Sequence, residues 1–304
     1  MPRNISKQKS LSTYQINFIV LMSKIFIFLF FCLIFLSACD IINPAEDIPS
    51  FIHIDKFSLI TTSEQGTNSH KITDAWVYVD GNFNGVYELP VTFPVLNEGK
   101  HEIKLYPGIK IFGIASSREI YPFYKNFVAE KDLKPKNIDT ISPTVYYFNE
   151  LNFSELWMED FGDEGIKLDT IFNGNVKLEQ ILDTVLNSKV GFINLTEDNN
   201  IFDCKSEELD LPKYSKRVYL EINYKCNHDF TIGLWANLSS STLRYPIIQL
   251  NPHPDSWNKA YIDLTQTTTA NPNAYDFSLF ITAILNDGST SGKIYIDNLK
   301  IIHF

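Results

Sequence analysis

Apolar and polar residues alternate over short stretches in the second half of the chain, and this pattern limits the fold most. The clearest stretch is 217–224, and similar ones follow at 230–235, 259–264, 276–281 and 293–301. Alternation with a period of two turns one set of side chains toward a core, as in a half-buried strand. Only the stretch 176–186 could instead form a short helix. Short strands without long helical stretches predict an all-β fold of sandwich type.

Turn signals separate the strands predicted between residues 52 and 148. Asp80-Gly81 and Asn84-Gly85 are typical of tight hairpin turns, and they follow the β-rich stretch 75–79. The order of strand, Asp-Gly turn, Pro90 and the Gly-x-His sequence at 99–101 resembles the small PEGA-type β-sandwich repeats of bacterial envelope proteins. The resemblance implies a module that supports binding or spacing. The chain departs from that short repeat by continuing through 118–124, where we expect an extra hairpin.

The stretch 293–301 resembles the closing strand of jelly-roll carbohydrate-binding modules. It has an aromatic residue, an apolar residue, Asp297, a polar residue and then alternating apolar residues. The stretch 257–264 is similar to an internal strand of that fold. The resemblance covers residues 149–304 and implies a jelly-roll sandwich; it is weaker evidence for sugar binding. We therefore expect a PEGA-like β-domain at 52–148 and a jelly roll at 149–304, separated by a linker around 131–143.

The N-terminal segment resembles the signal of a bacterial lipoprotein. Every residue from 25 to 36 is apolar, Lys24 precedes this run, and Leu36-Ser37-Ala38-Cys39 resembles a lipobox. The run fits the core of a secretory signal, and it is shorter than the ~18 residues that span a bilayer. The resemblance implies that residues 1–38 are removed, with Met22 as the true start. Cys39 then carries a diacylglycerol thioether and an N-acyl chain such as palmitate, and residues 39–51 form a tether.

An uncleaved membrane helix over residues 18–39 is the alternative to this signal peptide. With cleavage, we expect a protein of the cell envelope that is anchored by lipid to the outer membrane. Which face of the membrane it occupies stays open. Several acyl groups hold a protein stably on a bilayer, so the lipid would provide the membrane attachment.

The charge of the chain excludes some classes of partner. It has 26 basic and 36 acidic residues. Cleavage of the leader would leave 22 basic residues and a net charge of −14, because the leader contains basic residues and no acids. Such acidity argues against binding of nucleic acid and against electrostatic docking on anionic lipid.

Catalytic motifs are incomplete throughout the sequence. His101-Glu102 begins like a zinc-protease motif, but Leu105 stands where the second His would be. The Gly-rich stretch 288–293 is one residue short of a phosphate-binding loop and leads into a predicted strand. The carboxylates of the second half lack a glycosidase motif around them. We therefore expect no enzyme activity and no catalytic residue.

Acidic residues at both ends of the second half could bind a structural Ca²⁺. Jelly-roll modules often hold calcium between an early acidic residue and the Asp of the closing strand, and Ca²⁺ prefers oxygen ligands. This resemblance suggests Glu159, Asp160 and Asp297 as direct carboxylate ligands. The alternative is a solvated acidic loop and a strand Asp that caps a turn. We expect no other cofactor.

Aromatic residues are the other candidates for binding. Tyr245, Trp257 and Trp235, together with Trp157, could form a platform on which sugar rings stack, although Trp also packs into the core of any sandwich. In the first domain, the aromatic stretch with Tyr121, Phe123 and Tyr124 could form an exposed surface for docking a protein. Two functions follow from these alternatives: a binding protein for glycan or another polymer, or a structural subunit of an outer-membrane protein assembly.

Two cysteines, Cys204 and Cys226, remain after removal of Cys32 and lipidation of Cys39. An exported location permits them to form a disulfide. Two buried free thiols are the alternative, because the sequence does not give the distance between their Cα atoms.

Overall fold

The computed structural model describes residues 16–30, 47–153, 155–163, 165–171 and 174–304. The chain divides into two compact units, Met1–Ile48 and Pro49–Phe304. Residues 16–30 are helical, and no helix among the described residues is long and apolar enough to cross a membrane. The predicted lipidation site Cys39 lies outside the described residues, so the signal peptide and the anchor stay predictions.

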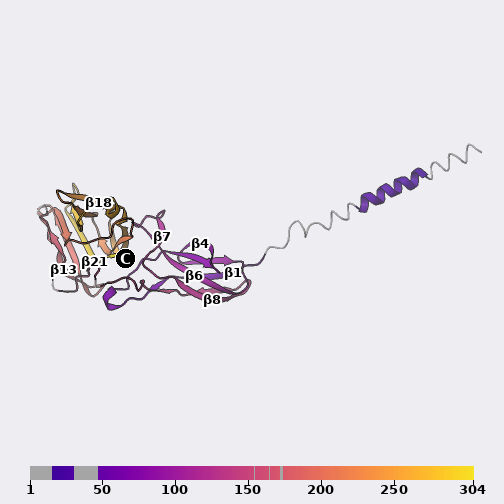
Figure 1. Ribbon diagram of the computed structural model, residues 1–304, viewed down its shortest axis with the longest axis horizontal. Helices are drawn as coiled ribbons and strands as arrows, with labels where there is room; N and C mark the ends of the chain where they lie inside the picture. Colours follow the sequence, from indigo (N-terminus) through magenta and orange to yellow (C-terminus); the bar gives the residue numbers. More distant parts are fainter. Residues whose placement is uncertain (1–15, 31–46, 154, 164, 172–173) are drawn as a thin grey trace, which may run out of the picture. The chain divides into compact units, whose positions relative to one another are not determined.

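The unit that begins at Pro49 is built of strands, which confirms the predicted all-β fold (Figure 1). Its first half forms a sheet in the order β5-β1-β9 (the β1 sheet), a sheet in the order β4-β3-β6-β7 with β8 paired to β6 (the β3 sheet), and the pair β10-β2. The strands are β1 Ser50–Ile54, β2 Ser58–Leu59, β3 Asp74–Val79, β4 Asn82–Glu88, β5 Val91–Val95, β6 Gly99–Lys110, β7 Arg118–Ile120, β8 Phe127–Leu133, β9 Ile138–Ile141 and β10 Thr144–Val145. A 3₁₀ helix, η1, spans Ser63–Gln65.

The turn between β3 and β4 follows the sequence prediction only in part. Asp80 and Gly81 both have positive φ, 49° and 78°, as a tight hairpin turn requires. The Asp80 carboxylate also accepts hydrogen bonds from the Glu102 backbone N–H at 2.9 Å and from His101 at 2.5 Å. The second predicted turn is wrong, because Gly85 lies within β4, beside a register shift in the ladder with β3.

The second half forms two larger sheets. One has the order β13-β14-β21-β16-β19 with β11 paired to β21 (the β16 sheet), and the other has the order β12-β15-β20-β17-β18 (the β17 sheet). The elements are β11 Met158–Glu159, β12 Leu168–Thr170, β13 Glu179–Asp183, β14 Ser188–Thr196, β15 Ile201–Ser206, β16 Val218–Cys226, β17 Phe230–Asn237, β18 Thr242–Leu250, β19 His253–Asp263, α3 Thr265–Ala270, β20 Asp276–Ile284 and β21 Ser291–His303. The stretch 176–186 thus contains the strand β13 and not a helix.

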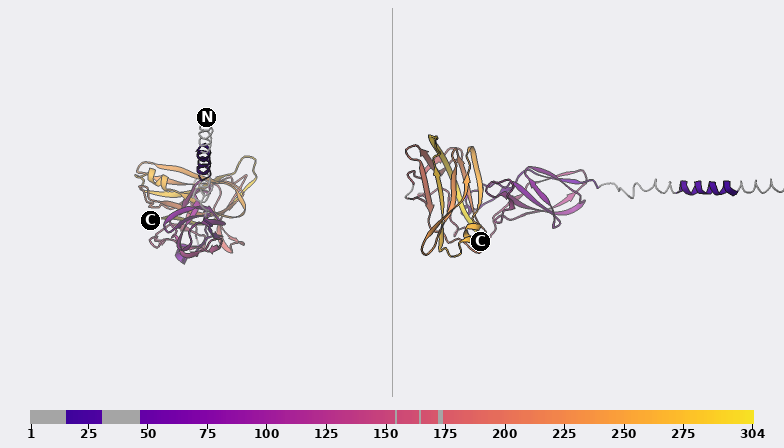
Figure 2. Two further views of the ribbon diagram at one scale, coloured as in Figure 1. Left: turned by 90° about the vertical axis from the view of Figure 1, so that its right-hand side faces the viewer. Right: turned by 90° about the horizontal axis from the view of Figure 1, so that it is seen from above.

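The strands of the second half lie at the left of the right-hand view of Figure 2. Alternating side chains of both sheets form the core of this sandwich. On β20, Phe277, Leu279 and Ile281 are fully buried in that core. Strand β16 departs from simple alternation, because nearly all of its residues are buried. Burial on both faces means that the β16 sheet is covered on its outer side as well.

The first half of the unit covers the outer side of the β16 sheet. Tyr219 of β16 and Tyr261 of β19 belong to the same apolar cluster as the core of the first half. Tyr121, Phe123 and Tyr124 lie in this cluster and are at most 1% exposed. The prediction of an exposed aromatic docking surface at these three residues is therefore wrong, because they pack against tyrosines of the chain's own sandwich.

A group of buried polar side chains around Glu221 lies within this contact. The Glu221 carboxylate forms an ion pair with Lys259 at 2.6 Å, and it accepts hydrogen bonds from the hydroxyls of Tyr121 at 2.7 Å and Tyr147 at 2.9 Å. Burial alone would raise the pKa of Glu221, but the neighbouring Lys259 and Lys300 and these hydrogen bonds hold it below its ordinary value. The two halves are thus joined by a buried carboxylate whose charge is compensated.

Cys204 and Cys226 are free, buried thiols. Cys204 belongs to β15 of the β17 sheet, and Cys226 ends β16 of the opposite sheet. The possible disulfide is therefore not formed, and each cysteine acts as a small apolar residue of the core.

Candidate functional site

The outer face of the β17 sheet presents polar and aromatic side chains that do not belong to the core. Strand alternation places Trp235 on this face of β17 and Ser278 on this face of β20, and the two residues are direct partners in the ladder. Their chain neighbours Leu234 and Leu279 point the other way, into the core. The same alternation that builds the sandwich therefore displays these two side chains together.

A hollow of about 240 Å³ lies over this pair, and it is lined by Ile171, Lys205, Trp235, Asn237, Thr242 and Ser278. The indole N–H of Trp235 and the hydroxyl of Ser278 are both buried and have no hydrogen-bond partner. Buried polar groups of native proteins are nearly always hydrogen-bonded. Two unpaired groups at one hollow therefore indicate a place where a ligand supplies the partners.

Arg244 holds the aromatic part of this face in place. Its guanidinium lies over the ring of Phe280 at 4.1 Å and over the ring of Trp235 at 5.1 Å. It also forms an ion pair with the buried carboxylate of Asp203 at 2.8 Å. Burial raises the pKa of Asp203 above its ordinary value, and Arg244 opposes this rise. The indole ring is thus fixed by a stacked and charge-paired neighbour.

Another hollow of about 230 Å³ lies on the same sheet beyond Phe280, and its lining includes Asp229, Thr231, Gln249, Thr282, Ile284 and Asn286. Asn286 donates a hydrogen bond to Asp229 at 2.9 Å, and Gln249 donates another. Thr231 and Thr282 are direct partners in the ladder between β17 and β20. Together with the first hollow and the Arg244 stack, this region forms one polar surface, which we call the β17 face.

A β-bulge lies on β18 at the centre of the β17 face, where Ile247 is the extra residue opposite β17. The ladder between β17 and β18 shifts register between Ile232 and Gly233. A Cβ atom at Gly233 would come within 2.1 Å of the Tyr245 carbonyl oxygen and 2.5 Å of the Phe280 ring. Only glycine therefore permits this close approach of β18 and Phe280.

Trp235, Tyr245 and Trp257, three of the predicted sugar-stacking residues, do not form one platform. Trp235 lies on the β17 face as described. Tyr245 packs against the core of the sandwich, and its hydroxyl donates a hydrogen bond to Asn271 at 2.9 Å. Trp257 belongs to β19 in the opposite sheet. The prediction of a platform shared by these three residues is wrong, because the period of the strands and the change of sheet separate them.

The carboxylates of the predicted calcium ligands accept hydrogen bonds from nearby residues, chiefly from backbone N–H groups. Glu159 accepts hydrogen bonds from the N–H groups of Phe161 at 2.7 Å and Lys167 at 2.6 Å, and Asp160 accepts one from Gly162 at 3.0 Å. Asp297 accepts two hydrogen bonds from Asn298. In the described part of the chain, no group of three acidic, His or Cys residues has the arrangement of a metal site. The structure therefore does not bring Glu159, Asp160 and Asp297 together as a ligand set.

The acidic surroundings of Asp297 still affect its ionisation. Its pKa is raised to about 7, chiefly by burial and in addition by the negative charges of Asp160, Asp183 and Glu159. At neutral pH this carboxyl is therefore close to half protonated. A cation bound nearby would lower the pKa again, so calcium binding stays a prediction.

Sequence reasoning identified Trp235 but missed most of the β17 face. Ser278 and Thr282 are the polar positions of the stretch 276–281 and its continuation, so alternation alone could have placed them opposite the core. Arg244 and Asp203 belong to strands that are distant in the sequence. Their pairing depends on the strand order, which the local pattern does not contain.

No protein-family model matches the chain. No curated protein matches it either. Among solved structures, the chain is similar to a xylan-binding carbohydrate-binding module, CBM22-2, of Paenibacillus barcinonensis, with 11% identity, a TM-score of 0.38, and coverage of 49% of this chain and 99% of the module. It is also similar to the family 11 carbohydrate-binding module of a cellulosomal cellulase of Clostridium thermocellum, with 14% identity, a TM-score of 0.34, and coverage of 49% and 95%.

A further similar structure is a carbohydrate-binding module of the β-sandwich superfamily. It is 12% identical, with a TM-score of 0.37 and coverage of 75% of this chain and 84% of that one. Similarities of this size do not transfer a function. Any function of this chain has to be argued from its own residues.

Proposed function

We propose that this protein is a non-enzymatic glycan-binding protein of the cell envelope, anchored to the outer membrane by lipid at Cys39, and that the β17 face holds a neutral polysaccharide. The observation that carries the proposal is the pair Trp235 and Ser278, whose polar atoms are buried at a hollow without a partner. A sugar ring would cover the indole with its apolar C–H face, while its hydroxyls pair with the indole N–H and the serine hydroxyl.

The carboxylates around the β17 face support binding over catalysis. Asp203 is paired with Arg244, Asp229 accepts hydrogen bonds from Asn286 and Gln249, and Asp276 accepts one from Asn237. A glycosidase needs one carboxyl group that carries a proton and another that is free to attack or to activate water. These three carboxylates are held by donors instead, so they shape the surface.

Replacement of two tryptophans tests the proposal. Affinity electrophoresis or calorimetry with soluble xylans and glucans is compared for Trp235→Ala and Trp257→Ala, since both side chains are half-buried and lie on opposite sheets. We expect Trp235→Ala to weaken binding by ~10-fold or more, because a central aromatic anchor carries much of the binding energy. We expect Trp257→Ala to leave it unchanged. Equal losses in both variants, or no retention of the parent protein on any neutral polysaccharide, would contradict the proposal.

A docking role for the first half is the second candidate. Its support is an aromatic cluster on the β3 sheet, where the ring of Phe83 is 56% exposed and contacts Trp76 and Tyr78. Tyr106 lies edge-on to Tyr78 in the same cluster. Exposed rings of this kind are typical of protein interfaces. A stoichiometric outer-membrane partner that co-purifies from detergent extracts and is lost with Phe83→Asp would favour this role.

A further inference from the structure

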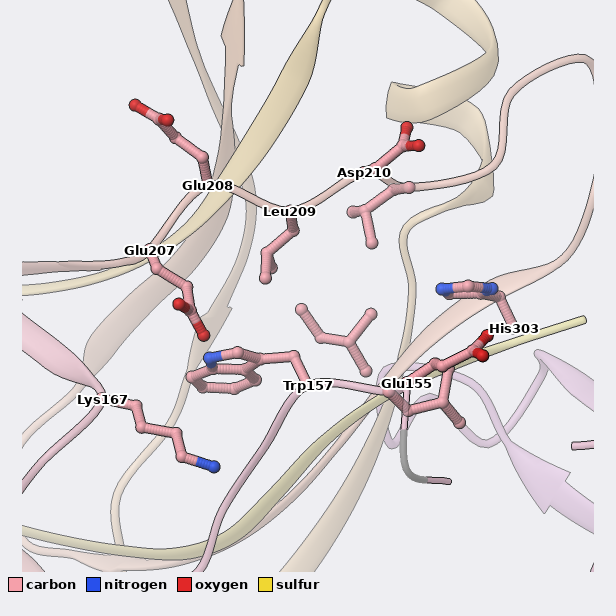
Figure 3. A pocket seen from close by; sticks show the side chains of 11 residues that line it. Glu155, Trp157, Lys167, Glu207, Glu208, Leu209, Asp210 and His303 are labelled. Atoms are coloured by element: carbon pink, nitrogen blue, oxygen red, sulfur yellow. The ribbon is translucent and has the colours of Figure 1, made fainter. Parts of the chain in front are cut away.

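A separate hollow of about 370 Å³ lies at one end of the sandwich, where residues 155–157, the segment 207–211 and the end of β21 meet (Figure 3). It shares no lining residue with the hollows of the β17 face. Leu209, Leu211 and Ile301 are buried there and give the hollow an apolar floor. Four exposed acidic side chains border this floor, Glu155, Glu207, Glu208 and Asp210; in Figure 3, Glu207 is turned toward the Trp157 ring and Glu208 and Asp210 are turned away from it.

The negative charge of this hollow is only partly compensated. None of the four acidic side chains forms an ion pair or a side-chain hydrogen bond with the described residues. The basic groups of the lining are Lys167, whose ammonium donates to the Met158 carbonyl at 2.8 Å, and His303. Burial lowers the pKa of His303, which keeps the imidazole neutral at pH 7. The hollow therefore attracts cations.

The indole N–H of Trp157 sets a second, independent requirement for a ligand of this hollow. Its side chain is 7% exposed, and its indole N–H is buried and has no hydrogen-bond partner. In Figure 3 the indole nitrogen is on the edge of the ring turned toward Glu207. An indole N–H can only donate, so a group that satisfies it has to carry a hydrogen-bond acceptor. A bare alkylammonium would satisfy the carboxylates and leave this donor unpaired.

We infer that this hollow binds an amino sugar with a free ammonium group. The ammonium pairs with the carboxylate of Glu207, which is turned toward the Trp157 ring in Figure 3, and a hydroxyl oxygen of the same ring accepts the Trp157 N–H. The C–H face of the ring lies on the apolar floor. This site is additional to the polysaccharide surface proposed above, and neither depends on the other.

Nuclear magnetic resonance of the full chain with three monosaccharides tests the site. Glucosamine, N-acetylglucosamine and glucose are titrated at equal ionic strength while the four indole N–H resonances are followed, with Trp157→Phe identifying its own signal. We expect glucosamine alone to saturate and to shift the Trp157 resonance. Binding of the three sugars with similar affinity would overturn the inference, as would binding of glucosamine without a shift of that resonance.

A charge-matched pair of variants separates a site from general surface charge. Glu207→Gln combined with Asp210→Asn removes two charges from the hollow, while Glu197→Gln combined with Asp198→Asn removes two exposed charges from another turn of the same half. We expect the first variant to weaken glucosamine binding at least ~10-fold and the second to leave it unchanged. Equal weakening in both would overturn the site. Trp235→Ala should not change glucosamine binding, so the two proposals can fail separately.

Discussion

The two outer faces of the sandwich differ in how their polar side chains are paired. On the β16 sheet, which the first half covers, the Glu221 carboxylate has Lys259, Tyr121 and Tyr147 as partners. On the β17 face, Trp235 and Ser278 have buried polar atoms without a partner. On the covered face the chain thus compensates its buried charge with an ion pair, although Glu221 Oε2 and Lys259 Nζ have no hydrogen-bond partner. On the β17 face the two unpaired groups line one hollow, which has room for an outside molecule.

Removal of the Glu221 carboxylate from the covered face should cause the largest loss of stability. In Glu221→Ala the buried ammonium of Lys259 and two tyrosine hydroxyls lose their partner, and a broken buried pair costs about 3–5 kcal/mol of unfolding free energy. Denaturant unfolding measures this loss of unfolding free energy. The control is Glu150→Ala at an exposed position, for which we expect a loss of less than ~0.5 kcal/mol. A loss below about 1 kcal/mol would mean that the covered face is not held by this group.

The pH dependence of stability distinguishes two buried carboxyls of the β16 sheet. Glu221 has a lowered pKa, whereas that of Asp297 is raised to about 7. Between about pH 4 and pH 7 the folded protein keeps a proton on Asp297 that the unfolded chain has released. Asp297 therefore costs stability as pH rises through this window, by on the order of 4 kcal/mol at about 1.4 kcal/mol per pKa unit.

Denaturant unfolding of Asp297→Asn at pH 4.5 and pH 8 measures this cost. We expect the variant to gain stability relative to the parent protein at pH 8 and to match it more closely at pH 4.5. If the stability of the parent protein and that of the variant rise by the same amount between these pH values, Asp297 does not carry this cost. A melting temperature that rises with Ca²⁺ in the parent and not in the variant would support the calcium prediction.

Two buried serines compare paired and unpaired hydroxyls directly. Ser50 donates a hydrogen bond to the Val95 carbonyl at 3.0 Å, whereas Ser278 has no partner. We expect Ser50→Ala to cost about 1 kcal/mol and Ser278→Ala to cost nothing measurable, because no hydrogen bond is lost. Thermal unfolding of both variants checks this. Ser278→Ala should still weaken polysaccharide binding, and a loss of stability without a loss of binding would make Ser278 a purely structural residue.

The smallest expected effect concerns the two thiols between the sheets. Burial raises the pKa of both Cys204 and Cys226, which keeps the thiols protonated and unreactive. We expect no change of melting temperature on addition of a reductant and no modification by a thiol reagent until the protein unfolds. A clear fall of the melting temperature under reducing conditions would show a disulfide instead.

The positions of the strands could be predicted from the sequence more reliably than the contacts between distant parts of the chain. Alternation placed the strands around Val218 and Phe277 correctly, because the period of side chains along a strand is local. It did not reveal that Tyr121 and Tyr124 would be buried against Tyr219 and Tyr261, since aromatic residues suit a protein interface and a core equally well.

The candidate site was predictable only where one residue carried the signal. Trp235 stood out as an aromatic residue in a strand, and it does lie on the β17 face. Its neighbours there, Arg244 and Phe280, come from β18 and β20, on either side of β17, and the order of strands within a sheet is a long-range property. The predicted partner Trp257 failed for the same reason, because β19 belongs to the other sheet, whereas Tyr245 lies on the neighbouring β18 with its ring against the core.

The position of β1 has a mechanical consequence. This strand begins at Ser50, at the start of the compact unit, and it is the middle strand of its sheet, antiparallel to β5 and parallel to β9. A force applied along β1 through the residues that precede it acts parallel to the strand, while its hydrogen bonds to both neighbours run across it. Those bonds are sheared together and do not open one after another. The first strand of the unit therefore resists a pull on the residues that precede it.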